Sequence, residues 1–207
     1  MNSVIDPQLH IVVLAAGASR RFGSPKQLAR VDGTPLLQGS VARAVAVAGH
    51  AVTVILGANA AALSGLLRSS PATVLINRQW EEGLASSLRV AVNSLPSGCD
   101  GVLVALADQV AVTREDLQRL IGTWRRQPSA IVAAAYGGVV GVPAIFPRWS
   151  FTHLADLRGD EGARLVLRQL ANRVTRVTLP NAAIDIDTPE DLAALAPARE
   201  GGAAPTE

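Results

Sequence analysis

Near its start the chain reads His10-Ile11-Val12-Val13-Leu14-Ala15-Ala16-Gly17. The four apolar residues at the centre of this segment, three of them β-branched, are typical of a strand that is buried on both faces of a sheet. The three small residues that follow are typical of a loop in which the backbone can approach a ligand closely. The segment therefore predicts a buried strand that leads directly into a binding loop.

Short apolar segments alternate with Ala- and Leu-rich segments along the rest of the chain. We expect strands at residues 10–14, 52–56, 73–76, 101–106, 129–135 and 174–179. We expect helices at residues 34–48, 59–68, 85–95 and 162–170, and two more that begin at Thr113 and Thr188. In the first of these helices, Thr34 is the expected N-cap and Pro35 the first helical residue.

This alternation predicts an α/β fold with three layers, in which a mostly parallel sheet carries helices on both faces. Ligands of such sheets bind outside the carboxyl ends of the strands. The segments that follow Leu14, Ile76, Leu106 and Ile186 are therefore the expected places for a functional site.

Composition and charge narrow the class of protein. The chain has 207 residues, of which 49% are hydrophobic and 17% charged, so we expect one folded domain at residues 9–196 between flexible ends at 1–8 and 197–207. No uncharged apolar run reaches the roughly 18 residues of a membrane-spanning helix, and residues 1–7 lack the features of a signal peptide, so we expect a cytoplasmic protein without a membrane partner. The net charge is only +2 and the arginines are scattered, which argues against nucleic acid as a partner. A single cysteine, Cys99, argues against a disulfide framework and a cysteine-rich zinc site.

The loop after the first predicted strand combines small residues with positive charge. Arg20, Arg21 and Lys26 follow Gly17, and Lys26 is the only lysine of the chain. Successive backbone N–H groups in such a turn form a concavity that binds anions, and nearby cations favour phosphate. Neither of the two common phosphate motifs, G-x-x-x-x-G-K-[ST] and G-x-G-x-x-G, occurs here. Phosphate binding is one interpretation of this loop, and an ordinary connection with exposed arginines is the other.

Carboxylates occur in two other segments of the chain where a functional site is expected. Asp108 follows the most apolar strand, and Asp185 and Asp187 are spaced two apart, so they can share a face of an extended segment. One or two carboxylates, completed by substrate phosphates, form a typical magnesium site. The alternative is that Asp108 is a loop or capping residue and that Asp187 and Thr188 only cap the last helix.

Together these motifs resemble the nucleotidyltransferases that attach a nucleotide to molybdopterin. The segment from Leu14 to Gly17, the pair Ser19-Arg20, and Pro25-Lys26-Gln27-Leu28 carry the resemblance, which is strongest to the molybdenum cofactor cytidylyltransferase branch. The resemblance spans roughly residues 9–195 and implies a Rossmann-like nucleotidyltransferase fold of the GT-A type. It implies that Leu14, Ala15, Ala16 and Gly17 bind the nucleotide.

The resemblance also implies catalytic and metal-binding roles. Arg20 and Lys26 would contact the triphosphate, and Asp108 would be both a catalytic residue and a metal ligand. Asp187 would complete the Mg²⁺ site, and Asp185 is the weaker candidate. Val110 stands where the family more often has proline.

Two further groups of residues match family segments near the substrates. The segment near the nucleobase is matched by Asn77, Gly83, Ser86 and Ser87, although both serines can also be explained as helix caps. The segments near the acceptor are matched by Gly141, Pro143, Asp160 and Arg164. Two positions depart from the family pattern: Leu84 replaces a usual methionine, and Val142 replaces a usual histidine or asparagine.

The activity implied by the resemblance is the transfer of CMP from CTP to the terminal phosphate of molybdopterin, with a molybdoenzyme as the recipient of the product. One alternative is another acceptor or base, such as a sugar phosphate or GTP. A different class remains open as well, namely an oxidoreductase or binding protein that holds a nicotinamide nucleotide in the same pocket. The acidic pair favours a magnesium triphosphate over a metal-free dinucleotide.

Overall fold

A computed structural model describes residues 8–195, so the expected flexible ends lie outside the described residues apart from Gln8. The described chain is built around a seven-stranded sheet with the strand order β5-β4-β1-β6-β8-β7-β9. Its strands are β1 (Leu9–Ala15), β4 (Val52–Leu56), β5 (Thr73–Ile76), β6 (Gly101–Leu106), β7 (Ile131–Tyr136), β8 (Val139–Pro147) and β9 (Val174–Thr178). A separate two-stranded sheet pairs β2 (Arg30–Val31) with β3 (Thr34–Pro35).

The large sheet is mostly parallel, as the sequence predicts. β1 pairs in parallel with β4 and β6, β4 with β5, and β7 with β9. β8 runs antiparallel to both β6 and β7. The β7–β8 hairpin turns at Gly137 and Gly138, which both have positive φ and so adopt a conformation that favours glycine. The antiparallel strand β8 that follows this glycine pair is not among the strands expected from the sequence.

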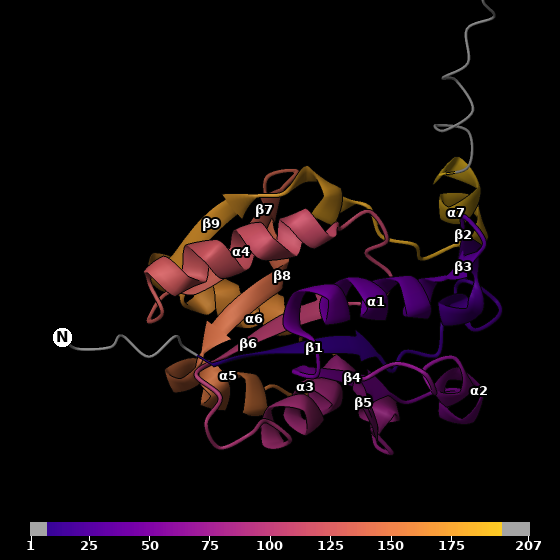
Figure 1. The fold of residues 1–207 in the computed structure, drawn as a ribbon, viewed down its shortest axis with the longest axis horizontal. Helices are drawn as coiled ribbons and strands as arrows, with labels where there is room; N and C mark the ends of the chain where they lie inside the picture. The colour runs from indigo at the N-terminus through magenta and orange to yellow at the C-terminus, as the bar shows by residue number, and fades with distance from the viewer. Residues whose placement is uncertain (1–7, 196–207) are drawn as a thin grey trace, which may run out of the picture.

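Helices cover both faces of the sheet, which gives the three layers (Figure 1). The α-helices are α1 (Leu36–Ala48), α2 (Ala60–Gly65), α3 (Leu84–Asn93), α4 (Arg114–Arg126), α5 (Phe151–Ala155), α6 (Ala163–Gln169) and α7 (Pro189–Leu195). Short 3-10 helices are η1 (Lys26–Leu28), η2 (Trp80–Glu82), η3 (Arg148–Ser150), η4 (Ala171–Arg173) and η5 (Pro180–Ala183). α1 and α4 pack together on one face, and α3, α5 and α6 lie on the other.

Alternation along β1 divides the core between these two faces. Ile11 and Val13 point towards α1 and α4, whereas Val12 and Leu14 point towards α3 and α6. All four side chains are buried, which explains why β1 has a continuous apolar sequence.

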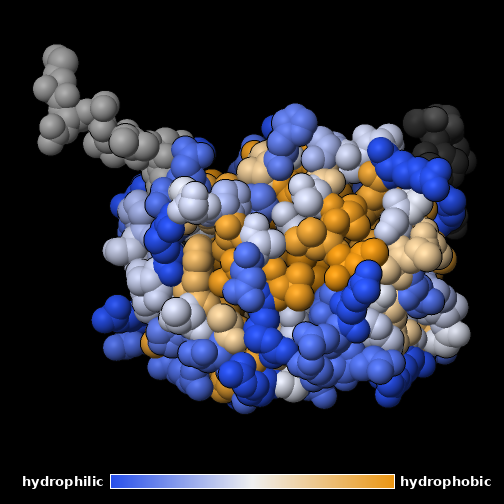
Figure 2. All heavy atoms as spheres, turned by 90° about the horizontal axis from the view of Figure 1, so that it is seen from below, coloured by the Kyte–Doolittle hydropathy of each residue, from blue (hydrophilic) through white to orange (hydrophobic). Residues whose placement is uncertain are grey.

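Not all apolar surface is buried. Figure 2 shows apolar residues gathered on the face of the molecule that carries α3 and β5. At the ends of these elements, Ile76 is 54% exposed and Leu84 is 38% exposed. None of the described helices is long and apolar enough to cross a membrane.

The prediction for residues 34 and 35 is wrong. Thr34 and Pro35 form strand β3, and α1 begins one residue later, at Leu36, with no side-chain cap. Asp32 and Gly33 both have positive φ and form the turn of a small hairpin with β2. Asp-Gly is a strong hairpin signal, and here it outweighs the local capping preference of Thr34. α2 is also shorter than expected, spanning Ala60–Gly65 instead of residues 59–68.

The predicted helix starts at Thr113 and Thr188 are confirmed. Thr113 and Asp116 form a reciprocal capping box at the start of α4. At α7, the Asp191 carboxylate accepts from the backbone N–H groups of Asp187 and Thr188, and the Thr188 hydroxyl accepts from the N–H of Asp191. The ends of the strands and these capped helix starts together determine where the candidate site residues lie.

Candidate active site

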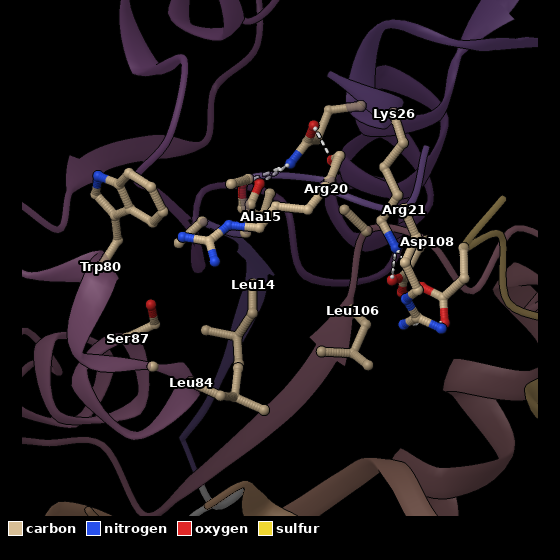
Figure 3. Close-up of a pocket in the computed structure, with 18 of the residues that line it drawn as sticks. Leu14, Ala15, Arg20, Arg21, Lys26, Trp80, Leu84, Ser87, Leu106 and Asp108 are labelled. Atoms are coloured by element: carbon tan, nitrogen blue, oxygen red, sulfur yellow. Dashed lines mark hydrogen bonds and ion pairs between the residues drawn. The ribbon is translucent and has the colours of Figure 1, made fainter. Parts of the chain in front are cut away.

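A cavity of about 510 Å³ opens at the carboxyl ends of β1 and β6 (Figure 3). The loop after β1 forms one wall, from Leu14 to Arg21 together with Lys26. The segment from the end of β6 to Asp108 and the start of α3 form the others. The predicted location at strand ends is therefore where the structure has its candidate site.

The loop after β1 is held in shape by the buried side chain of Gln27. Its Nε2 donates to the carbonyl oxygens of Ala15 (3.2 Å) and Gly17 (2.9 Å), and its Oε1 accepts from the Ser19 hydroxyl (3.2 Å). Gln27 is only 4% exposed. Ser19 itself has a positive φ of 55°, so the loop turns sharply just before Arg20. One glutamine thus fixes the turn that presents the cations.

Two glycines near this loop differ in what surrounds them. A Cβ at Gly57 would lie 2.5 Å from the Cβ of Trp80 and 2.7 Å from the Ala16 carbonyl oxygen, so packing requires glycine there. A Cβ at Gly17 would meet nothing within 4 Å, and Gly17 does not have positive φ. Neither packing nor backbone strain within the described chain explains Gly17, and the open space beside it faces the cavity.

Lys26 joins the two predicted metal ligands. Its Nζ lies 2.7 Å from Oδ2 of Asp108 and 2.8 Å from Oδ1 of Asp187. The side chains are largely buried, with 16% of Lys26, 21% of Asp108 and 28% of Asp187 exposed. Lys26 thus contacts two residues that lie 82 and 161 positions further along the sequence.

The surroundings of Lys26, Asp187 and the nearby Asp185 shift the pKa values of these three groups. Burial lowers the pKa of Lys26, but the Asp108 and Asp187 carboxylates outweigh burial, and the net pKa is raised. The hydrogen bond from Lys26 is the largest cause of the lowered pKa of Asp187. For Asp185, which is exposed, desolvation and then the charge of Asp187 raise the pKa. The Lys26 ammonium thus lies between the side chains of Asp108 and Asp187.

The two arginines of the loop face different partners. Arg21, whose side chain is 72% exposed, pairs with Oδ2 of Asp187 at 2.8 Å. Arg20 lines the cavity and extends towards the side on which Trp80 lies (Figure 3). The loop therefore places the Arg21 guanidinium beside the Asp187 carboxylate and extends the Arg20 side chain along the cavity.

The donor set at Asp108 fits a divalent metal ion. Oδ1 of Asp108 is buried and has no hydrogen-bond partner within the described chain. Across residues 8–195, no group of three or more His, Cys, Asp or Glu side chains is placed to hold a metal ion. A metal at Asp108 and Asp187 would therefore complete its coordination with phosphate oxygens and water, which is how magnesium is commonly bound.

The residues expected near the nucleobase are split between the cavity and its support. Ser87 and Gly83 line the cavity. Asn77, 2% exposed, donates from Nδ2 to the hydroxyls of Ser86 (2.7 Å) and Ser87 (3.0 Å) and so lies behind the cavity wall. Ser86 donates to the carbonyl of Gly83, and neither serine caps α3.

The residues expected near the acceptor lie around the other side of the same strand ends. Asp160 lines the main cavity, and a Cβ at Gly83 would lie 2.5 Å from its Oδ1. Arg164 lines a second cavity, of about 360 Å³. Gly141 and Pro143 are buried on β8 and line neither cavity, and the Val142–Pro143 peptide bond is cis.

A family comparison agrees with this arrangement. Residues 11–174 match the model of the MobA-like NTP transferase domain. The chain belongs to this family. Membership of this family supports a nucleotidyltransferase role.

Individual proteins that are similar to this chain carry different names. Nicotine blue oxidoreductase of Paenarthrobacter nicotinovorans is 30% identical over 192 residues, which cover 87% of this chain and 93% of the relative. The structure of Rv0371c from Mycobacterium tuberculosis H37Rv is similar with a TM-score of 0.80 and 29% identity, over 92% of this chain and 98% of that one. A structure of Rv0371c in complex with manganese matches with a TM-score of 0.76 and 27% identity, over the same shares of the two chains.

Some cavity residues of this family member were not singled out by sequence reasoning. Trp80, on η2, lines the main cavity and offers an aromatic surface there. The sequence feature that could have identified Trp80 is its position shortly after a predicted strand end, in a chain with only 3% aromatic residues. Gln109, beside Asp108, lines the second cavity; it belongs to the segment that carries Asp108, but its sequence alone assigned it no role.

Proposed function

We propose that this protein transfers CMP from CTP to the terminal phosphate of a molybdopterin-type acceptor and releases pyrophosphate. The observation that carries the proposal is the contact of Lys26 with both Asp108 and Asp187 inside a cavity rimmed by Arg20 and Arg21. The choice of CTP rests on Pro25-Lys26-Gln27-Leu28, which resembles the cytidylyltransferase branch and supplies both Lys26 and the Gln27 clamp.

The proposed reaction is an in-line displacement at phosphorus. An oxygen of the acceptor phosphate attacks the α-phosphorus of CTP, and a new P–O bond forms. The bond from the α-phosphorus to the oxygen that bridges to the β-phosphate breaks, and pyrophosphate leaves with that electron pair. Such chemistry depends on positioning and charge stabilisation and needs no covalent intermediate on the protein.

The residues of the chain would divide this work. The Leu14–Gly17 segment would lie under the triphosphate, where the open space at Gly17 allows close approach of the backbone. Arg20 and Lys26 would neutralise the charge that grows on the leaving pyrophosphate, and losing one such cation commonly costs roughly 100- to 1000-fold in rate. Ser87 and Trp80 would contact the base and ribose from the α3 side of the cavity.

Asp108 and Asp187 would hold the metal, for which we propose Mg²⁺. A divalent cation at these carboxylates would supply charge neutralisation at the triphosphate oxygens. Support comes from the unpartnered Oδ1 of Asp108 and from the manganese complex of the Rv0371c relative. We place the reaction in the cytoplasm, within a domain that spans residues 9–196, with a molybdoenzyme as recipient of the product.

One relative favours a second candidate function. The 30% identity to nicotine blue oxidoreductase supports an oxidoreductase or binding protein that holds a nicotinamide nucleotide in the same cavity. The two candidates differ in their need for metal, since the acidic pair favours a metal-bound triphosphate and repels a metal-free pyrophosphate. GTP or a sugar phosphate as substrate would keep the same chemistry with another donor or acceptor.

A ligand panel separates the two candidates. The protein is heated with CTP, GTP, ATP, UTP, NADH or NADPH, each with and without Mg²⁺ or Mn²⁺. A ligand at 100 times its dissociation constant adds about 2.7 kcal/mol to the free energy of unfolding, which gives a visible shift in Tm. Stabilisation by CTP that depends on metal supports the transferase, and metal-independent stabilisation by NADPH would overturn it.

Turnover then tests the proposed residues. Pyrophosphate release from CTP is measured with molybdopterin as acceptor, for the unmodified protein, Asp108→Asn and Asp156→Asn. We expect at least a 100-fold loss of rate for Asp108→Asn. Asp156, an exposed residue at the end of α5, is the matched control and should change little. Unchanged turnover in Asp108→Asn would contradict the mechanism.

A further inference from the structure

A second cavity of about 360 Å³ lies beside the candidate active site. The two cavities share Leu14, Leu84 and Leu106 in their linings. Leu14 and Leu106 are paired neighbours at the ends of β1 and β6, and Figure 3 shows the three leucines on the side of the main cavity away from Lys26 and Arg20. A ligand could therefore reach from the phosphate-binding loop across these leucines into the second cavity.

The second cavity is mostly apolar. Leu88, Val104 and Val142 line it along with the three shared leucines. Its charged lining residues are Arg164 and Asp185, and both are exposed. This lining suits a ring system with limited polarity better than a second phosphate group.

One buried polar atom of a residue that lines this cavity has no hydrogen-bond partner in the described chain. Gln109 is 4% exposed, and its Oε1 accepts no hydrogen bond from the described residues. Its Nε2 donates to the carbonyl oxygens of Val142 and Ala182, at 2.9 Å each. Exchanging the two amide atoms would set Oε1 against two carbonyl oxygens, so the orientation of this amide is fixed. The unpaired atom is therefore an acceptor that only a donor from outside the described chain can satisfy.

The segment around Gly141 supports this amide. The Val142 carbonyl, which accepts from Gln109, also accepts from the Tyr136 hydroxyl at 3.3 Å. A Cβ at Gly141 would lie 2.5 Å from that hydroxyl oxygen and 3.5 Å from a guanidinium nitrogen of Arg164. Gly141 thus allows Tyr136 and Arg164, both of which line the cavity, to approach β8. The predicted acceptor segment acts here through its backbone.

We propose that this cavity holds the ring of the acceptor, a flat nitrogen heterocycle, and that Gln109 determines its specificity by accepting a hydrogen bond from a ring N–H or amino group. This assignment rests on the proposed function, because it places the acceptor on the opposite side of Leu14 and Leu106 from the triphosphate. A nucleobase offers similar chemistry, but Trp80 and Ser87 give the base a place in the main cavity.

The test uses pterin as a probe, with its intrinsic fluorescence as the readout of binding. The matched probe is 2-dimethylamino-3-methylpteridin-4-one, in which methyl groups replace every N–H hydrogen. We expect the unmodified protein to bind pterin at least tenfold more tightly than the methylated probe, because a donor to Gln109 is lost. Equal binding of the two probes, or no binding of pterin, would overturn the proposal.

Variants show whether Gln109 causes this preference. In Gln109→Met the preference for pterin should fall to near unity, whereas Leu88→Met, a volume-conserving change in the same cavity wall, should keep it. If Gln109→Met does not fold, Ala183→Phe tests the location, because this exposed rim residue can be enlarged to fill the cavity. Ala183→Phe should then weaken both probes; unchanged binding would contradict the assignment.

Competition separates this proposal from the proposed function. Pterin binding is measured again with saturating CTP and Mn²⁺, and we expect it to persist, since the two ligands occupy different cavities. Displacement of pterin by CTP would assign the second cavity to the nucleobase and overturn the inference. If CTP does not bind at all but the preference for pterin follows Gln109, the inference stands and the transferase proposal fails.

Discussion

Lys26 is the residue on which both the charge balance and the proposed chemistry of the site depend. Its ammonium neutralises two carboxylates that would otherwise repel one another, and all three side chains are largely buried. Arg21 contacts the same Asp187 from the surface, with 72% of its side chain exposed. These two ion pairs thus share a carboxylate but differ in burial.

This difference gives a prediction for stability. Lys26→Met should lower the free energy of unfolding by about 1–3 kcal/mol, because a buried charge-assisted network loses its cation. Arg21→Met should cost at most about 1 kcal/mol, as exposed pairs do. Urea unfolding in metal-free buffer measures both. Lys26→Met should also gain more Tm from Mn²⁺ than the unmodified protein, because the ammonium no longer competes for the carboxylate oxygens. Equal losses in the two variants would contradict the role of burial.

At the scale of elements, the loop after β1 is fixed by its contacts with neighbouring segments. Gln27 on η1 holds the carbonyls of Ala15 and Gly17, and the N–H of Ala58, just after β4, donates to the Ala16 carbonyl at 3.0 Å. The shape of the loop is therefore set by hydrogen bonds within the described chain. Gly57 permits the contact with β4, and Gly17 leaves space on the cavity side.

The two glycines should therefore respond differently to the same change. Gly17→Ala should leave the free energy of unfolding within about 1 kcal/mol of the unmodified value, because nothing lies within 4 Å of the new Cβ. It should nevertheless weaken CTP binding at least tenfold if the triphosphate lies on this loop. Gly57→Ala should destabilise the fold, since the Cβ would overlap Trp80. Thermal unfolding and a CTP titration with Mn²⁺ measure these effects. Normal CTP affinity in Gly17→Ala would remove the nucleotide from this loop.

Local patterns predicted those elements that local physics decides. The helix start at Thr113 and the buried strands β1 and β6 depend on residues close in sequence, and these predictions are confirmed. The N-cap at Thr34 failed because Asp32-Gly33 forms a hairpin that recruits Thr34 into a strand. The direction of β8 depends on where its chain returns along β6, which no local pattern specifies.

At the scale of the whole molecule, the site also contains some residues that local sequence identifies and others whose role depends on the fold. The rule that ligands bind at strand ends predicted which segments to examine, and the resemblance to the nucleotidyltransferases implied that Lys26, Asp108 and Asp187 of those segments form one site. Gln109 was missed because its two carbonyl partners, Val142 and Ala182, lie 33 and 73 residues away. The role of a neutral amide can be recognised only when the fold brings such carbonyl oxygens within hydrogen-bond distance of it.

The stability of the whole fold should depend on pH through His10. This residue lies in β1, where its Nε2 is 2.9 Å from the hydroxyl of the buried Thr53, and burial lowers its pKa. The unfolded chain therefore binds a proton at His10 below about pH 6.5, whereas the folded chain resists it. Because the unfolded state then binds more protons, the free energy of unfolding falls as the pH drops through this range.

A matched pair of variants isolates this contribution. Chemical unfolding between pH 7.5 and about pH 5 should show a smaller loss of stability in His10→Gln, since the uncharged amide does not titrate and can still hydrogen bond to Thr53. His50→Gln, at an exposed position before β4, should retain the full pH dependence. An unchanged slope in His10→Gln would mean that β1 tolerates the charged imidazole. β1, an interior strand of the sheet, would then open locally at its start without cost to the fold, and the rigid frame that holds the binding loop would begin further along β1.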